Sequence, residues 1–245
     1  MWRITPQRRF ATAIAVIVLA AAIPALAVPI DSTLFTTYTI NTTHTSLDWV
    51  VCGSTQSSSG CYASGALGPF AKVGAILEGN QSVNLTTNTV TRLIYVLDIA
   101  TGNTQNGVTL YVYKKTDTIS PTFDTVNVSL TKTVTLSQIV GGALARASMA
   151  ANAKFLFIGT NQSPTALKVQ KGTYAITQIG GFSPPINVTS ITTNKYGYAT
   201  VTFGSFNGPS NGFVVFDPSG NSKEDGGGAS FMLNTDQAVL PATFP

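Results

Sequence analysis

The chain has few of the side chains that carry most enzyme chemistry. Its 245 residues include one histidine and two cysteines, and only 10% of them are charged. A single histidine, His44, excludes a multi-histidine metal site and any mechanism that needs two histidines. These absences favour a protein that is not an enzyme.

The N-terminus resembles an export signal. Three arginines and no acidic residue precede an apolar run over residues 10–23, and a small-x-small pattern ends at Ala27. We therefore predict a signal peptide over residues 1–27, cleaved after Ala27, and a single all-β domain over residues 28–245. The protein would then be secreted or periplasmic. The alternative is an uncleaved N-terminal helix that tethers the protein to a membrane.

Removal of the signal peptide lowers the net charge. The whole chain has 14 basic and 10 acidic residues, and three arginines leave with the signal, so the mature chain has 11 basic residues and a net charge of +1. The densest basic run left is Lys114-Lys115. Because the sequence shows no basic patch, we expect no nucleic-acid partner and no membrane partner after cleavage.

The two cysteines lie close together in "CGSTQSSSGC", as Cys52 and Cys61. In an oxidising compartment such a pair forms a disulfide, which here would close a flexible loop of Gly, Ser, Thr and Gln. The spacing is not the C-x-x-C of metal or redox sites. We predict a structural disulfide.

A Thr- and Asn-rich triplet recurs along the chain. It ends at His44 in "INTTHTSLDWVV", at Asn88 in "LTTNTVTRLIYVL", at Asn152 in "SMAANAKFLFIG" and at Asn194 in "ITTNKYGYATVTF". Two of the three intervals are near the period of about 40 to 45 residues of propeller blades, which this spacing resembles. The resemblance implies an all-β, propeller-like fold with about four antiparallel blades and implies no functional residue. The alternative is a two-sheet β-sandwich.

Apolar runs follow the triplets at consecutive rather than alternate positions, as in residues 93–97 and 155–158. Such runs are typical of strands that are covered on both faces. We therefore expect a charge at Ile94 or Phe157 to unfold the protein, and a charge at Lys115 to be tolerated. "AKVGAILEG" and "ASFMLN" would each be the last strand of a blade. The longest interval, from Asn88 to Asn152, predicts an insertion between Thr116 and Asp124.

One loop has the oxygen pattern of a calcium site. In "DPSGNSKEDGGG", the side chains of Asp217, Ser219, Asn221 and Asp225 supply oxygen atoms at nearly alternate positions. The pattern departs from the EF-hand loop, and a solvated hairpin turn is the alternative. No other cofactor is predicted.

The remaining candidates for chemistry are scattered carboxylates: Glu78, Asp98, Asp117, Asp124, Asp217, Glu224, Asp225 and Asp236. A pair of carboxylates can hydrolyse glycosidic bonds. The function favoured by the sequence is a secreted, non-catalytic β-domain that binds a ligand, glycan or protein partner. The alternative is a carboxylate-dependent glycoside hydrolase or lyase on a propeller scaffold.

The export prediction can be tested directly. Mass spectrometry of the protein recovered outside the cytoplasm should find Val28 as its first residue, because signal peptidase cleaves after the small residue of the pattern. An intact N-terminus in the membrane fraction would instead support the uncleaved helix.

Overall fold

The computed structural model describes residues 35–54, 59–100, 107–120, 122–180, 186–204 and 211–228. These residues form β-strands and turns and contain no helix. The predicted signal peptide, its cleavage site after Ala27, the segment "ASFMLN" and Asp236 lie outside them. The expected all-β class is confirmed.

The strands form four antiparallel sheets in chain order. Sheet A contains β1 (Phe35–Ile40), β2 (Leu47–Ser54) and β3 (Ser59–Leu67). Sheet B contains β4 (Val73–Glu78), β5 (Ser82–Asn84), β6 (Thr89–Asp98), β7 (Thr109–Thr118) and β8 (Thr125–Thr135). Sheet C contains β9 (Ala147–Ala151), β10 (Phe155–Thr160), β11 (Thr165–Gln170) and β12 (Ile176–Gly180). Sheet D contains β13 (Asn187–Thr193), β14 (Ala199–Gly204), β15 (Asn211–Phe216) and β16 (Ser222–Gly228). Four sheets rule out the two-sheet sandwich.

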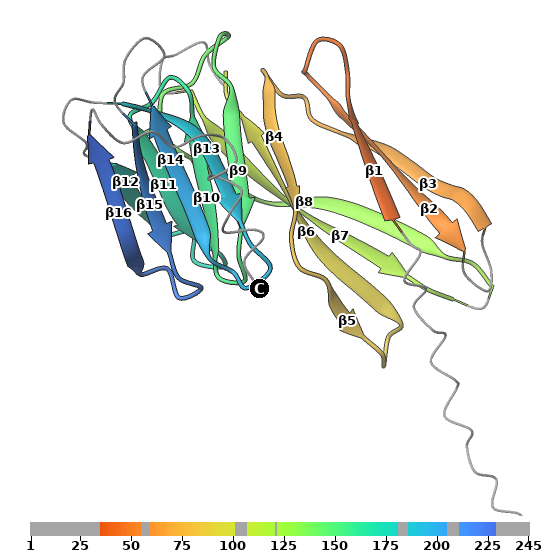
Figure 1. Ribbon diagram of the computed structural model, residues 1–245. Helices are drawn as coiled ribbons and strands as arrows, with labels where there is room; N and C mark the ends of the chain where they lie inside the picture. The colour runs from red at the N-terminus through yellow and green to blue at the C-terminus, as the bar shows by residue number, and fades with distance from the viewer. Residues whose placement is uncertain are drawn as a thin grey trace, which may run out of the picture.

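The sheets stack face to face, from sheet A on the right of Figure 1 to sheet D on the left. Each of the three interfaces has its own apolar core. In β10, Leu156 and Ile158 pack toward sheet B, and Phe157 between them packs toward sheet D; all three are fully buried. Ile94 is likewise fully buried, between sheets A and B. This confirms that the apolar runs are strands covered on both faces.

The first strands of sheets B, C and D lie next to one another. β9 contacts both β4 and β13. Just before β4, Lys72 Nζ donates a hydrogen bond to the carbonyl of Ala145 at 3.0 Å, and the backbone N–H of Ile191 in β13 donates to Ser148 Oγ in β9 at 3.0 Å. The sheets are therefore joined along one side of the stack, although the described residues form no closed propeller.

Three of the four triplets mark equivalent turns. Asn88, Asn152 and Asn194 each lie in the turn that leads from the first strand of a sheet into its second. In sheet B, β4 and β5 pair with β6 one after the other, so together they take the place of a single first strand. His44 also lies in the turn between the first two strands of its sheet, just before the inner strand β2, but this turn is not equivalent in space to the other three. The carbonyl of His44 accepts a hydrogen bond from the N–H of Val73, where β4 begins, so its turn lies at the opposite end of the stack. Within the described residues, sheet A has three strands and none equivalent to β4.

The long interval between Asn88 and Asn152 has a different cause from the predicted insertion. Thr116 lies within β7, and a short turn connects β7 to β8. The interval is long mainly because β6, β7 and β8 have 10, 10 and 11 residues, whereas β10, β11 and β12 have 6, 6 and 5.

Two strand assignments also differ from the prediction. "AKVGAILEG" supplies β4, which begins sheet B, while the Cys61 segment forms β3 and completes sheet A. β16 is the last strand of sheet D within the described residues, and Asp225 lies within it. The Gly-rich composition of β16 had indicated a loop, but pairing with β15 holds it as a strand.

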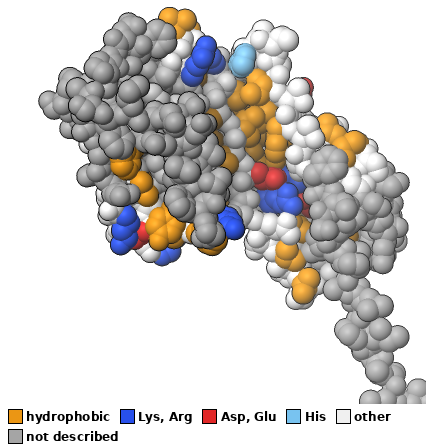
Figure 2. All heavy atoms as spheres, in the orientation of Figure 1, with side chains coloured by type: hydrophobic (Ala, Val, Ile, Leu, Met, Phe, Trp, Pro, Cys, Tyr) orange, Lys and Arg blue, Asp and Glu red, His pale blue; other side chains and the backbone are white. Residues whose placement is uncertain are grey.

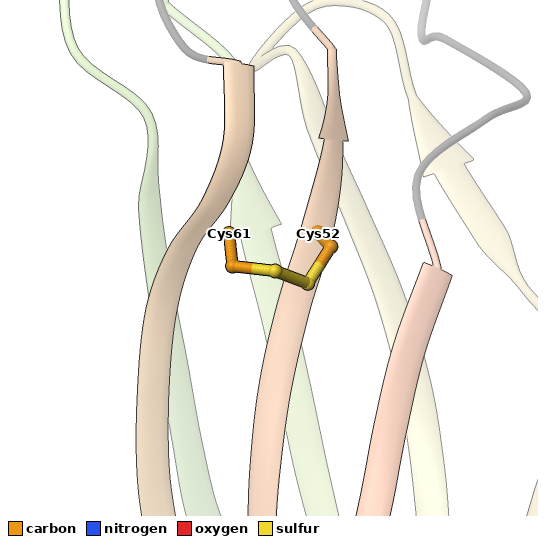
Figure 3. Close-up of a disulfide and its surroundings, with 2 residues drawn as sticks. All are labelled: Cys52 and Cys61. Carbon is orange, nitrogen blue, oxygen red and sulfur yellow. A yellow bond between two sulfur atoms is a disulfide. The ribbon is translucent and has the colours of Figure 1, made fainter.

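The disulfide joins neighbouring strands. Cys52 in β2 and Cys61 in β3 are register partners, and their sulfur atoms are bonded (Figure 3). The predicted pairing is confirmed. The bond closes the β2–β3 hairpin near its tip.

Buried Phe157 provides a test of the stack. We expect Phe157→Asp to lower the free energy of unfolding by at least the roughly 3 to 5 kcal/mol that a buried Phe→Ala change costs, because the carboxylate would be desolvated between sheets C and D. Denaturant titration followed by circular dichroism measures this. The control is Leu144→Asp, at a side chain that is 87% exposed, and it should change stability by no more than about 0.5 kcal/mol. Equal effects of the two substitutions would contradict the packing.

Candidate functional site

Hairpin turns of sheets C and D meet at one end of the stack, which we call the hairpin end. It consists of the turns at residues 152–154, 171–175, 194–198 and 217–221. Three side chains tie these turns to one another. Asn152 Nδ2 donates to the carbonyl of Gly197 at 2.9 Å, Lys171 Nζ to the carbonyl of Asn152 at 2.6 Å, and Lys168 Nζ to the carbonyl of Gly220 at 2.6 Å.

Two glycines allow the close approach of these turns. Gly220 has a φ of 81°, and a β-carbon on it would lie 2.5 Å from the ring of Phe155. Gly197 has a φ of 84°, and its β-carbon would lie 3.3 Å from Pro218. Both backbones adopt a conformation that favours glycine. The turns therefore pack against each other and hold the hairpin end in a fixed shape.

The hairpin end is basic. Five lysines from separate segments gather there: Lys154, Lys168, Lys171, Lys195 and Lys223. Figure 2 shows basic side chains interleaved with apolar ones at the lower end of sheets C and D. Among the side chains described there, Asp217 is the one carboxylate, and it lies 3.4 Å from Lys223 Nζ. Sequence reasoning missed this cluster because no two of the lysines are adjacent in the chain.

Two of the five lysines support the structure. Lys168 Nζ lies 5.2 Å from the ring centroid of Phe155 and 5.5 Å from that of Phe216, while it bonds the carbonyl of Gly220. Burial lowers the pKa of Lys171, whose Nζ lies 5.8 Å from the centre of the Tyr95 ring. The other three lysines are exposed. They can contact a ligand.

Exposed tyrosines accompany the exposed lysines. Tyr196 and Tyr198 are 47% and 39% exposed, and both belong to the β13–β14 turn. Asn194 Oδ1 accepts hydrogen bonds from the backbone N–H groups of both tyrosines, each at 3.0 Å. Lys195 Nζ lies 5.0 Å from the ring centroid of Tyr196. Aromatic rings and an amine are thus held together on one fixed turn.

The predicted calcium loop is also at this end. Asp217 Oδ1 accepts hydrogen bonds from the backbone N–H groups of Ser219 and Asn221, each at 2.9 Å, and the bond from the Asn221 N–H is the main cause that lowers the pKa of Asp217. Asp217 Oδ2 accepts a bond from Asn221 Nδ2 and faces Lys223. Asp225 lies beyond the turn, opposite Val214. In the described residues no group of three or more His, Cys, Asp or Glu side chains is arranged to hold a metal ion. Calcium binding here stays a prediction.

Two further carboxylates hold parts of the fold together. Glu78 accepts hydrogen bonds from Arg92 and from the hydroxyl of Tyr38, each at 3.1 Å, and so joins sheets A and B. Burial, with Glu78 beside it, raises the pKa of Tyr38, so its hydroxyl keeps the proton that it donates. Asp98 is buried and accepts hydrogen bonds from three backbone N–H groups, two of them in the segment before β4. Both carboxylates therefore have structural partners.

Asp117 and Asp124 lie between sheets A and B. Asp117 pairs with Lys115 at 2.7 Å, and Lys115 is only 2% exposed, so the expectation of a tolerant surface lysine was wrong. Burial raises the pKa of Tyr62 to about 12, and the charges of Asp117 and Asp124 add to the effect. Tyr62 Oη and Asp117 Oδ1 are buried and have no hydrogen-bond partner in the described part of the chain. Asp117 and Asp124 both act on Tyr62, but both carboxylates are buried.

A small groove lies at the other end of sheets C and D. Its volume is about 270 Å³, and its lining residues are Arg146, Ala147, Ser148, Gly159, Thr160, Asn161, Val188 and Thr189. A β-carbon on Gly159 would lie 2.8 Å from the Val188 side chain, so β10 and β13 approach closely there. Ser148, Thr160 and Asn161 are hydrogen-bonded within the protein. No carboxylate lines this groove.

His44 and Asp48, a histidine and a carboxylate four residues apart, do not form a site. His44 lies exposed in the β1–β2 turn with a φ of 59°, and Asp48 lies exposed in β2 opposite Thr39. Neither side chain has a hydrogen bond or ion pair with the other in the described structure. The pair offers no general base.

No protein-family model matches the chain, and no curated protein matches it. Of the residues described, none forms a helix with the length and hydrophobicity of a membrane span. The functional argument therefore depends on the hairpin end itself.

The Asn194 turn can be tested by substitution. We expect Asn194→Ala to lower the free energy of unfolding by about 1 to 3 kcal/mol, because two backbone N–H groups would lose their acceptor. Denaturant titration measures the loss. Asn194→Asp keeps an oxygen at the same position and should retain most of the stability. If Asn194→Ala were as stable as the parent, the turn would not depend on this side chain.

Proposed function

We propose that the protein is a secreted, non-catalytic domain that binds a glycan through the hairpin end. The observation that carries this proposal is the β13–β14 turn, on which Asn194 holds exposed Tyr196 and Tyr198 beside Lys195. Tyrosine has an apolar ring and a polar hydroxyl, which together suit a ligand with both C–H and O–H groups. A sugar ring is such a ligand.

The fixed shape of the hairpin end supports binding. Ligand affinity is reduced by the entropy lost when mobile side chains and loops become ordered. One side-chain oxygen of each of Asn152, Asn194 and Asp217 accepts hydrogen bonds from two backbone N–H groups. The turns are therefore ordered before a ligand binds. Binding would then cost less entropy than on a flexible loop.

Secretion and the propeller-like arrangement are part of the proposal. The Cys52–Cys61 disulfide supports an oxidising compartment. The adjacent first strands of sheets B, C and D support an interpretation of the four sheets as about four blades of a propeller-like fold. In that interpretation the hairpin turns form one end of the blades, where loops are free to bind.

The alternative, a carboxylate-dependent glycoside hydrolase or lyase, has weaker support. Glu78, Asp98 and Asp217 accept hydrogen bonds that hold the fold, and Asp117 pairs with buried Lys115. Glycoside hydrolysis by a carboxylate pair needs two carboxylates that face the sugar. The exposed charged side chains described at the hairpin end are mainly lysines.

The proposal is tested by measuring the binding of immobilised polysaccharides, neutral and acidic, to the mature chain that begins at Val28. We expect Tyr196→Ala with Tyr198→Ala to weaken binding about tenfold or more, a loss of roughly 1.4 kcal/mol. The control is Phe123→Ala, at an aromatic side chain that is 70% exposed in the β7–β8 turn, and it should leave binding unchanged.

Two results would count against the proposal. Binding that is insensitive to the tyrosine pair would place the site elsewhere, with the Arg146 groove as the next candidate. Release of reducing sugars, abolished by Asp117→Asn or Asp124→Asn, would favour the hydrolase.

A further inference from the structure

We infer that the glycan bound at the hairpin end is anionic and carries carboxylate or sulfate groups; this inference rests on the proposed function. The mature chain as a whole has a net charge of only +1. The hairpin end nevertheless gathers five lysines, and Asp217 is the one carboxylate among the side chains described there. The fold therefore concentrates positive charge at the same end as the exposed tyrosines.

The exposed lysines have little internal compensation. Lys154 and Lys195 form no ion pair with any carboxylate that the structure describes, and Lys223 is 57% exposed although it lies near Asp217. In the rest of the described chain, the charged pairs Glu78–Arg92 and Lys115–Asp117 neutralise each other. Among the described side chains, the charges of Lys154 and Lys195 are thus uncompensated and available to a ligand.

The positions of these lysines suit a chain with repeated negative charges. Lys154 and Lys195 come from two different turns and Lys223 from the start of β16, and the bonds of Asn152 and Lys168 hold these segments together. A lysine ammonium is a compact point charge without the planar fork of arginine. It attracts any anionic group and selects no particular geometry. The tyrosines would then contact the sugar rings while the lysines contact the acidic groups.

A glycan fits this surface better than a nucleic acid. Nucleic-acid recognition relies heavily on arginine, which contacts phosphates and base edges with bidentate hydrogen bonds. The two arginines of the described structure, Arg92 and Arg146, lie outside the hairpin end. The predicted export also removes the protein from most cellular nucleic acid.

The test compares four polymers against the mature protein by isothermal titration calorimetry: dextran, polygalacturonate, dextran sulfate and single-stranded DNA. We expect polygalacturonate or dextran sulfate to bind at least tenfold more tightly than dextran. With about three charge contacts, the affinity should fall on the order of tenfold between about 50 and about 200 mM salt. A comparison of the affinities for polygalacturonate, which carries carboxylates, and dextran sulfate, which carries sulfates, shows which acidic group the protein prefers.

Matched lysine variants locate the charge effect. Lys154→Ala with Lys195→Ala should weaken binding of the acidic polysaccharide about tenfold, and by a larger factor than it weakens binding of dextran. The control pair, Lys114→Ala with Lys132→Ala, removes two exposed lysines of sheet B and should have no effect. Equal losses in the two pairs would overturn the inference, since only net charge would then matter.

The outcomes separate this inference from the proposed function. Binding of dextran as tight as that of the acidic polymers, and sensitive to the tyrosine pair, would overturn the anionic ligand and keep the glycan-binding function. Binding of DNA as tight as that of the acidic polysaccharides would overturn recognition of a glycan. Failure to bind any of the three polysaccharides would count against the proposed function as well.

Discussion

The packing of each sheet against the next is the constraint on which the rest of the structure depends. In β10, neighbouring residues face opposite cores, with Leu156 and Ile158 toward sheet B and Phe157 toward sheet D. A central strand must therefore be apolar at consecutive positions, and apolar burial stabilises it on both faces. Because the faces between neighbouring sheets are used for packing, the loops and turns at the two ends of the strands are free to bind a partner. The hairpin end and the Arg146 groove occupy those two ends.

Polar side chains fix the ends of this stack in the way that apolar side chains fix its interior. A turn leaves backbone N–H groups without strand partners, and such groups need acceptors when they are buried. Asn152 and Asn194 supply that acceptor at equivalent turns of sheets C and D. Asn152 Nδ2 also donates a hydrogen bond to the carbonyl of Gly197, in the β13–β14 turn of sheet D. The conformation of each of these two turns therefore depends on the other. This coupling makes several short hairpins into one surface.

The sequence predicted the features that depend on local pattern. The apolar run around Phe157, the Cys52–Cys61 bond and the equivalence of the Asn152 and Asn194 turns follow from residue type and spacing, and all are confirmed. His44 was misassigned because a Thr-rich triplet does not show the direction of the strand it precedes. A charge at Lys115 was expected to be tolerated, but Lys115 is buried and paired with Asp117. The gathering of Lys154, Lys195 and Lys223 depends on contacts between turns that are distant in sequence, so no local pattern could show it.

The scarcity of charge makes the exposed lysines of the hairpin end informative. Burying a charge is costly unless a partner of opposite sign compensates it, and the pairs Lys115–Asp117 and Glu78–Arg92 meet that requirement between sheets A and B. Lys154 and Lys195 serve no such packing role, since both are exposed and neither pairs with a carboxylate in the described structure. Like charges held near one another repel, which is a small cost to the folded state. An anionic ligand on this surface would remove that repulsion, and the tyrosines beside Lys195 would give the ligand an apolar contact that charge alone does not supply.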